Sequence, residues 1–205
     1  LDRTRLCVHR EKNRPSIVIW SMANESNWNQ WWGRVLNVNK KLDSSRPYTF
    51  HHQNMKGEKL RIWGVDIANQ HYPSEHNSDE WSSHKEPLWF GEYAHLQCYN
   101  RRELMTDPSI HEDWSRPLQR MVDLMWKQKG CLGGAIWSGI DDIFILPDGS
   151  ECGYGSWGPI DGWRREKPEY HGMRMAYTPM RLFSSSVNQE GKLVLNVQNR
   201  FNFKN

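Results

Sequence analysis

The stretch Ile17-Val18-Ile19-Trp20-Ser21-Met22-Ala23-Asn24-Glu25 decides the fold class. Its first four residues form a continuous β-branched and aromatic run, which is typical of a strand covered on both faces of a parallel sheet. Before it, Pro15 ends a polar helix predicted over residues 2–12, because the residue preceding a proline is disfavoured in the α region. After it, residues 29–42 carry apolar side chains at helical spacing. Strands and helices in alternation indicate an α/β fold.

The same alternation continues along the chain. Apolar runs predict further strands at residues 48–51, 62–67, 87–91 and 132–137, a short polar helix over 78–84 and a long helix over 110–129. Pro117 is expected in the first turns of the long helix or at a kink, and Gly130 at its end. A Gly-rich, acidic loop is expected to run to about residue 168. Five such strands are half or more of a closed (β/α) barrel, or a doubly wound sheet.

The pattern changes after Pro179. Residues 181–186 and 192–197 are predicted to be strands joined by a turn at Gln189-Glu190-Gly191, and the alternation in the second strand is typical of a half-buried antiparallel strand. We therefore expect residues 1–178 to form the α/β part, as a barrel or a doubly wound sheet, and residues 179–205 to begin a β-sandwich domain.

Composition excludes several classes of protein. The chain has 205 residues, 37% apolar and 25% charged, and lacks the run of about 18 apolar residues that a membrane span requires. The 27 basic and 24 acidic residues are dispersed and give a net charge of +3, which does not indicate a nucleic-acid surface. The four cysteines lack CxxC spacing, which argues against a zinc ribbon and leaves the compartment open.

Tryptophan is unusually frequent, with 12 residues in the chain. Any one indole is more often part of a core, because aromatic side chains dominate protein interiors. Its flat face also suits the apolar face of a sugar ring. As a set, the tryptophans favour a carbohydrate ligand.

Two glutamates follow predicted strands. Glu25 comes after the first strand and Glu92 after the fourth, and the carboxyl ends of parallel strands meet on one face of a barrel. Glycoside hydrolysis needs such a pair, because one carboxyl group protonates the departing oxygen while the other attacks or activates water. A single glutamate after a strand is usually a surface residue, but these two stand among Asn, Trp, Tyr and His. We therefore predict a glycosidase site.

The histidines give a weaker signal. Four of them invite a metal-binding interpretation: His51, His52, His71 and His84. None forms an HxxxH or HxH pair on a predicted element, so solvated or packed histidines are favoured.

Three motifs, in order, resemble one enzyme family. Residues 13–26 (NRPSIVIWSMANES) look like the acid/base motif of glycoside hydrolase family 2, the family of β-galactosidases and β-glucuronidases. Residues 92–95 (EYAH) resemble the nucleophile motif of its β-galactosidase branch, and residues 133–137 (GGAIW) resemble the last barrel strand. The resemblance implies the C-terminal part of a (β/α)8 TIM barrel, strands 4 to 8, followed by the first strands of a β-sandwich domain.

The resemblance also implies a retaining double displacement. Glu25 would be the general acid/base and Glu92 the nucleophile that forms the glycosyl-enzyme ester. An ionised Glu92 close by would keep Glu25 protonated until ester formation removes that charge.

Further residues match positions of the family motifs. Asn24 would contact the sugar 2-hydroxyl, Tyr72 the nucleophile, His95 the sugar hydroxyls, and Trp137 would form the floor of the sugar subsite. Strand-end capping remains the alternative for Asn24 and plain packing for the other three. Asp141 would bind sugar hydroxyls or cap the next turn.

The resemblance leaves the sugar open. Asp141 and Asp142 would repel a uronic acid, and the Asn-x-Lys element of the glucuronidase branch is not found, which favours terminal β-galactosides. The alternatives are a β-glucuronide, a β-mannoside or an α-arabinopyranoside, or a remnant that binds carbohydrate without cleaving it.

The chemistry itself requires no cofactor. The best-known branch binds Mg²⁺ through the acid/base glutamate and two residues that would lie upstream of Leu1, so a Mg²⁺ ion in the parent enzyme stays open, with Glu25 as one candidate ligand. The partner expected is a carbohydrate, with neither nucleic acid nor membrane, and homo-oligomerisation of the parent is left open. With the first barrel strands missing, the isolated 205 residues are expected to be inactive.

Overall fold

The computed structural model describes residues 2–52, 64–94, 112 and 114–201. In chain order the elements are α1 (Asp2–Glu11), β1 (Trp20–Ser21), α2 (Gln30–Leu42), β2 (Tyr48–Thr49), β3 (Ala68–His71), the 3-10 segment η2 (Glu75–Ser83), β4 (Leu88–Tyr93), α5 (Arg116–Lys127), β5 (Cys131–Ile136), β6 (Asp142–Ile145), β7 (Glu151–Gly155), α6 (Glu169–Tyr177), β8 (Met180–Val187) and β9 (Leu193–Asn199).

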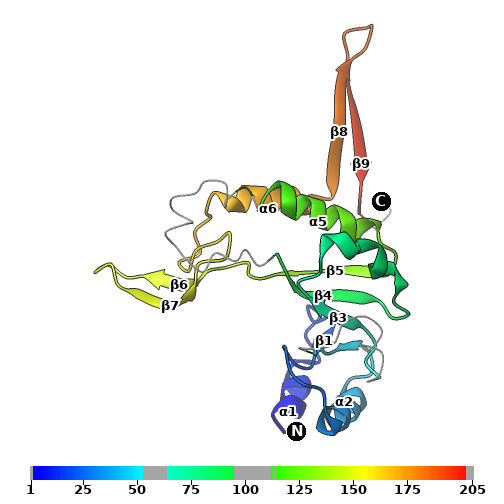
Figure 1. Ribbon diagram of the computed structural model, residues 1–205, viewed down its shortest axis with the longest axis vertical. Coiled ribbons are helices and arrows are strands. Elements are labelled where there is room, and N and C mark those ends of the chain that lie inside the picture. The colour runs from blue at the N-terminus through cyan, green and yellow to red at the C-terminus, as the bar shows by residue number, and fades with distance from the viewer. Residues whose placement is uncertain (1, 53–63, 95–111, 113, 202–205) are drawn as a thin grey trace.

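The first five strands run parallel and neighbour one another in chain order. β1 pairs with β2, and β3, β4 and β5 form a second ladder. A bridge between Thr49 and Ile67 joins the two ladders. α5 and α6 lie along one side of the β3–β5 ladder, and α1 and α2 lie beyond β1 (Figure 1). The predicted α/β fold is confirmed, but over the described residues β1 and β5 each have a single strand neighbour, so the sheet is open and the barrel is not closed.

Two strand boundaries differ from the prediction. The first strand, expected over residues 17–20, is reduced to Trp20–Ser21, and Val18 is 70% exposed. Ladder pairing with β2 begins only at Trp20, so Val18 lies before the paired part of the strand. The strand expected over 62–67 lies instead at Ala68–His71, where Ala68 and Asn69 are buried; residues 62 and 63 fall outside the described residues.

The main helices follow their sequence signals. Asn29 caps α2, its side chain accepting a hydrogen bond from the Trp31 N–H at 2.9 Å. Pro117 lies in the first turn of α5, and Gly130 follows this helix with φ +82°, a conformation that glycine adopts without strain. Over the described ranges, no helix combines the length and apolarity needed to cross a membrane.

The main core forms where the strands face α5 and η2. Its buried members come from these elements, from α6 and from the segments after β2 and before α5: Phe50, Ala68, Trp81, Leu88, Phe90, Tyr93, Trp114, Leu118, Met125 and Ala176. This core holds β4, the strand that carries Glu92.

The segment expected to be a loop is partly regular. It contains the β6–β7 hairpin and helix α6. The glycines of this segment led to the expectation of a loop. At Gly153, with φ +119°, a Cβ atom would lie 2.3 Å from the Asp142 carbonyl oxygen on the paired strand. Glycine here permits the close approach of two strands.

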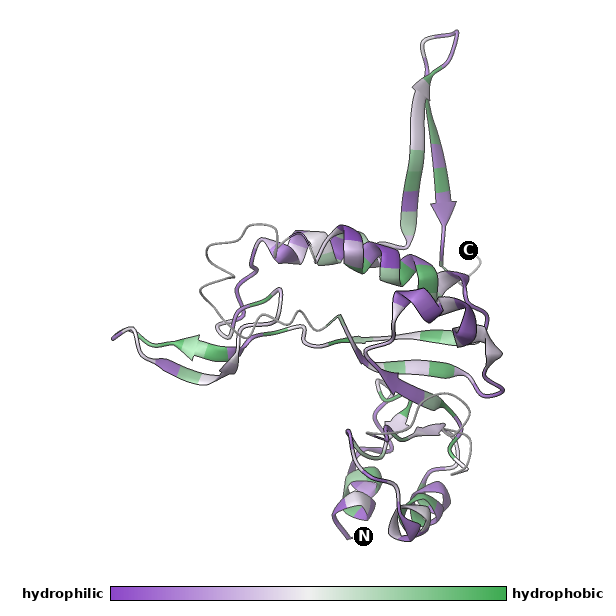
Figure 2. Ribbon diagram, in the orientation of Figure 1, coloured by the Kyte–Doolittle hydropathy of each residue, from purple (hydrophilic) through white to green (hydrophobic). Residues whose placement is uncertain are grey.

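The hairpin predicted after Pro179 is present as β8 and β9 and projects away from the rest of the molecule (Figure 1). At its base, Arg181 donates hydrogen bonds to the carbonyls of Met175 and Ala176, both at 2.5 Å, and pairs with Asp123. The hairpin carries both apolar and polar residues (Figure 2), but every residue of β9 is exposed, in contrast to the half-buried strand expected. That residues 179–205 begin a sandwich domain stays a prediction.

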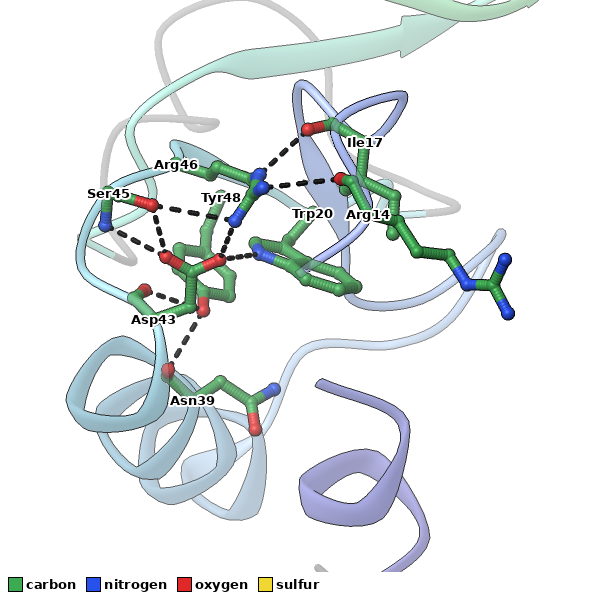
Figure 3. Close-up of polar contacts among 8 residues, drawn as sticks. All are labelled: Arg14, Ile17, Trp20, Asn39, Asp43, Ser45, Arg46 and Tyr48. Atoms are coloured by element: carbon green, nitrogen blue, oxygen red, sulfur yellow. Dashed lines mark hydrogen bonds and ion pairs between the residues drawn. The ribbon is translucent and has the colours of Figure 1, made fainter. Parts of the chain in front are cut away.

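A buried polar cluster fixes β1 to α2 (Figure 3). The Asp43 carboxylate accepts hydrogen bonds from Trp20 Nε1 at 2.8 Å, Arg46 Nη1 at 2.6 Å and Ser45 Oγ at 2.6 Å. Burial alone would raise the pKa of Asp43, but the hydrogen bonds from Ser45, Trp20 and Arg46 outweigh it and hold the pKa well below its usual value. The cluster therefore positions the strand that leads to Glu25.

Candidate active site

Glu25 lies just beyond the carboxyl end of β1. Its backbone is in the left-handed region, with φ +39°, and its side chain is 40% exposed. Glu25 Oε1 lies 3.0 Å from His71 Nδ1, the last residue of β3. A turn in an uncommon conformation thus leaves this carboxyl group accessible.

Glu92 lies near the end of β4 and is buried. The Tyr72 hydroxyl donates a hydrogen bond to Glu92 Oε2 at 2.5 Å, and the Tyr72 N–H donates to the Glu92 carbonyl at 2.9 Å. Tyr72 also has a left-handed backbone, with φ +47°, which follows the irregular pairing of His71 with Glu92. A phenol donor at this place fixes the orientation of the Glu92 carboxyl group.

His71 brings the two carboxyl groups together. Its Nδ1 atom is 3.0 Å from Glu25 Oε1 and 3.5 Å from Glu92 Oε2. Because both distances end on the same nitrogen, these two oxygens are no further apart than 6.5 Å, the sum of the two distances. The sheet therefore gathers both sequence-predicted glutamates at one edge.

His51 supports His71 from the side. The two imidazole rings stack with centroids 3.4 Å apart and planes 6° from parallel. Burial, which disfavours the charged form, is the main cause that lowers the pKa of His51 to about 4, so His51 is neutral near pH 7. Sequence reasoning favoured solvated or packed histidines and missed both residues as parts of the site. The available signal was their position, since each lies at the carboxyl end of a strand.

Gly91 makes room for His71. A Cβ atom at position 91 would lie 2.7 Å from His71 Nε2 and 2.6 Å from Asn69 Oδ1. The Gly91 N–H donates a hydrogen bond to that same Asn69 oxygen at 3.0 Å. The absence of a side chain is therefore required for the imidazole to lie where it does.

Glu25, His51 and His71 also form a candidate metal-ligand set. One ligand atom from each lies within 4.8 Å of the others, and His51 Nδ1 is buried with no hydrogen-bond partner in the described part of the chain. Two parallel, stacked rings cannot both aim a lone pair at one ion unless one of them turns. Mg²⁺ prefers oxygen ligands in octahedral geometry, and this set offers one carboxylate and two nitrogens, which fits it poorly. The Mg²⁺ site that would use upstream residues stays a prediction.

The remaining predicted site residues lie in different surroundings. Asn24 is exposed beside Glu25, and Trp137, directly after β5, is 37% exposed with its ring 6.4 Å from that of Trp157. Asp141 is buried, and Lys167 Nζ lies 3.1 Å from both of its carboxylate oxygens. Burial raises the pKa of Asp141, against the Gly158 N–H and Lys167, which lower it. His95 falls outside the described residues.

Residues 1–127 match the model of glycosyl hydrolases family 2, TIM barrel domain. The chain belongs to glycosyl hydrolase family 2. Membership agrees with the resemblance carried by the motifs around Glu25 and Glu92, and it makes the chain part of a glycosidase family whose enzymes bind sugar substrates.

Individual family 2 relatives divide between two activities. The chain is 28% identical over 145 residues to the beta-galactosidase of Kluyveromyces lactis, covering 67% of this chain and 12% of that protein. It is 26% identical over 118 residues to the beta-glucuronidase of Sus scrofa, covering 54% of this chain and 16% of that protein. The chain thus spans a small part of the lengths of these relatives.

Solved structures share the fold. The beta-D-glucuronidase of Dictyoglomus thermophilum superposes with a TM-score of 0.62 at 21% identity, covering 87% of this chain and 35% of that one. A GH2 beta-galacturonidase from Eisenbergiella tayi, bound to galacturonate, gives 0.60 at 18% identity, covering 86% and 35%. At these identities the likeness concerns the fold alone.

Proposed function

We propose that the enzyme containing this chain is a retaining glycosidase that cleaves terminal β-galactosides. The observation that carries the proposal is the convergence of Glu25 and Glu92 on His71 Nδ1, at 3.0 and 3.5 Å. Retaining glycosidases hold their carboxyl groups about 5–5.5 Å apart, whereas inverting enzymes need about 6.5–9.5 Å to admit a water molecule. The upper limit of 6.5 Å between the two oxygens supports the retaining geometry.

The residues suggest how the reaction proceeds. A Glu92 oxygen attacks the anomeric carbon while Glu25 gives its proton to the glycosidic oxygen, which leaves with the electron pair of the broken bond. Glu25, now a carboxylate, removes a proton from water, and the resulting hydroxyl attacks the anomeric carbon and releases Glu92. Tyr72, donating at 2.5 Å, orients Glu92 for attack. No cofactor takes part in these steps.

The surroundings of Asp141 bear on the choice of sugar. Lys167 Nζ lies 3.1 Å from both carboxylate oxygens of Asp141. The positive charge of Lys167 is therefore already compensated by Asp141 and is not free to bind the carboxylate of a uronic acid. This arrangement supports a neutral sugar as the substrate. A β-glucuronide is the second candidate, because the chain is also 26–29% identical to beta-glucuronidases over part of its length.

A panel of aryl glycosides tests the proposal. The full-length natural protein that contains this sequence is assayed with the β-galactoside, β-glucuronide, β-mannoside and α-arabinopyranoside, and NMR identifies the first anomer released. We expect the β-galactoside to be cleaved with release of the β anomer. Release of the α anomer contradicts the retaining mechanism, and binding without cleavage of any glycoside supports the non-catalytic alternative.

Two variants with one control assign the carboxyl groups. Glu92→Gln is expected to abolish turnover, and Glu25→Gln to lower kcat by about 10²- to 10⁴-fold, the usual range for general acid/base residues. Glu190→Gln, in the exposed β8–β9 turn, is the matched control and should leave activity unchanged. Equal activity in all three variants contradicts the assignment.

A further inference from the structure

The carboxyl group of Glu25 has one polar contact among the described residues, and it is with His71. Oε1 lies 3.0 Å from Nδ1, while the side chain is otherwise 40% exposed. An acid/base group must present one oxygen to the glycosidic bond, and misplacement by about 1 Å can cost roughly 100-fold in rate. An exposed side chain held at a single point depends on that point for its orientation.

His71 is itself held rigidly. Its side chain is 5% exposed, its face stacks on His51 at 3.4 Å, and its Nε2 edge packs over Gly91, where a Cβ atom would lie only 2.7 Å away. Packing on several sides fixes a side chain in one geometry, which is what a group that orients another requires.

We propose that His71 is a positioning residue for the acid/base, donating its Nδ1–H to Glu25 Oε1 so that Oε2 is the oxygen that carries the catalytic proton. This role rests on the proposed function. One tautomer serves both half-reactions, since Oε1 accepts the same hydrogen bond whether Oε2 is protonated or not.

The contact strengthens as the first step proceeds. When Oε2 gives its proton to the leaving oxygen, negative charge develops on the carboxyl group, and a hydrogen bond to a carboxylate is about twice as strong as one between neutral groups. An interaction that is stronger in the transition state than in the ground state accelerates the step. The rate gain from the hydrogen bond between His71 and Glu25 is confined to substrates whose leaving group needs a proton.

Leaving-group dependence tests the role. Values of kcat/KM, which report formation of the glycosyl-enzyme, are measured in the full-length protein for phenyl and 2,4-dinitrophenyl β-galactoside. We expect His71→Ala to lose roughly 10- to 100-fold on the phenyl substrate and little on the dinitrophenyl one, which departs without a proton. His71→Asn, which keeps an N–H donor near the Nδ1 position, should recover most of the loss. His76→Ala, on the exposed face of η2, is the control and should change neither value.

Equal losses on both substrates, or no loss, overturn the role of His71 while leaving the proposed function intact. A wild-type protein inactive toward both contradicts the β-galactosidase proposal itself, and the corresponding pair of β-glucuronides then carries the same test. NMR of ¹⁵N-labelled histidine gives a readout that does not require turnover. Glu25→Gln should shift the Nδ1 resonance of His71 and Glu190→Gln should not; an unchanged resonance in Glu25→Gln overturns the contact.

Discussion

Gly91→Ala should damage the site through a single methyl group. The added Cβ would lie 2.7 Å from His71 Nε2 and 2.6 Å from Asn69 Oδ1, whereas ordinary contacts begin at 3.4 Å. Both side chains must therefore move by about 0.7 Å or more to restore normal packing. His71 cannot move toward His51, because the two rings are already 3.4 Å apart.

The magnitude follows from this displacement. Overpacking of a filled site costs about 1–3 kcal/mol of unfolding free energy. Because His71 contacts Glu25 and lies near Glu92, a shift approaching 1 Å should lower kcat/KM by roughly 100-fold.

The assay, made in the full-length natural protein, pairs urea unfolding with turnover of an aryl glycoside. Gly33→Ala is the matched control, since no atom lies within 4 Å of its added Cβ and it lies inside helix α2. There alanine should raise stability by about 1 kcal/mol and leave activity unchanged. If Gly91→Ala is as stable and as active as the wild type, the reasoning about the crowded His71 site is wrong.

Three further predictions concern stability. Asp43→Ala should cost roughly 3–5 kcal/mol of unfolding free energy in urea, because it leaves Arg46 without its buried partner, whereas the exposed control Glu190→Ala should cost less than about 1 kcal/mol. Since the pKa of Asp43 is lowered in the fold, the contribution of this carboxylate to the unfolding free energy should be complete above about pH 4 and should fade as the pH falls below that. The pKa of His51 is lowered to about 4 in the fold, so the unfolded chain binds a proton there first as the pH drops below about 6.5, and the wild type should lose more unfolding free energy between pH 7 and pH 5 than His51→Phe does. Arg181→Ala removes the hydrogen bonds to the last turn of α6 and should speed amide hydrogen exchange in β8 and β9, while exchange in β4 stays unchanged.

Local signals in the sequence accounted for most of the regular elements. Asn29 begins α2, Pro117 lies in the first turn of α5 and Gly130 follows its end, because capping and backbone restrictions act over a few residues. The β6–β7 hairpin was missed because its glycines are typical of loops. Gly153 serves there to let two strands approach, a requirement set by the partner strand.

Strand lengths were harder to predict than strand order. Val18 belongs to an apolar run, yet it is 70% exposed and lies before Trp20, where pairing with β2 begins. Likewise, the apolar pattern of β9 predicts a covered face, and its residues are exposed where no described segment packs on them. Burial depends on neighbours that the local pattern cannot identify.

The sequence by itself determined that Glu25 and Glu92 each follow a strand, that they lie at the same end of a parallel sheet, and that Tyr72 stands between them in the motif order of family 2. These properties depend on residues adjacent in the chain. Only the tertiary structure decided that His71 contacts Glu25, 46 positions away, and that His51 stacks on its ring. Such contacts arise where separate strands end side by side, and their geometry follows from sheet register and from the space left by Gly91.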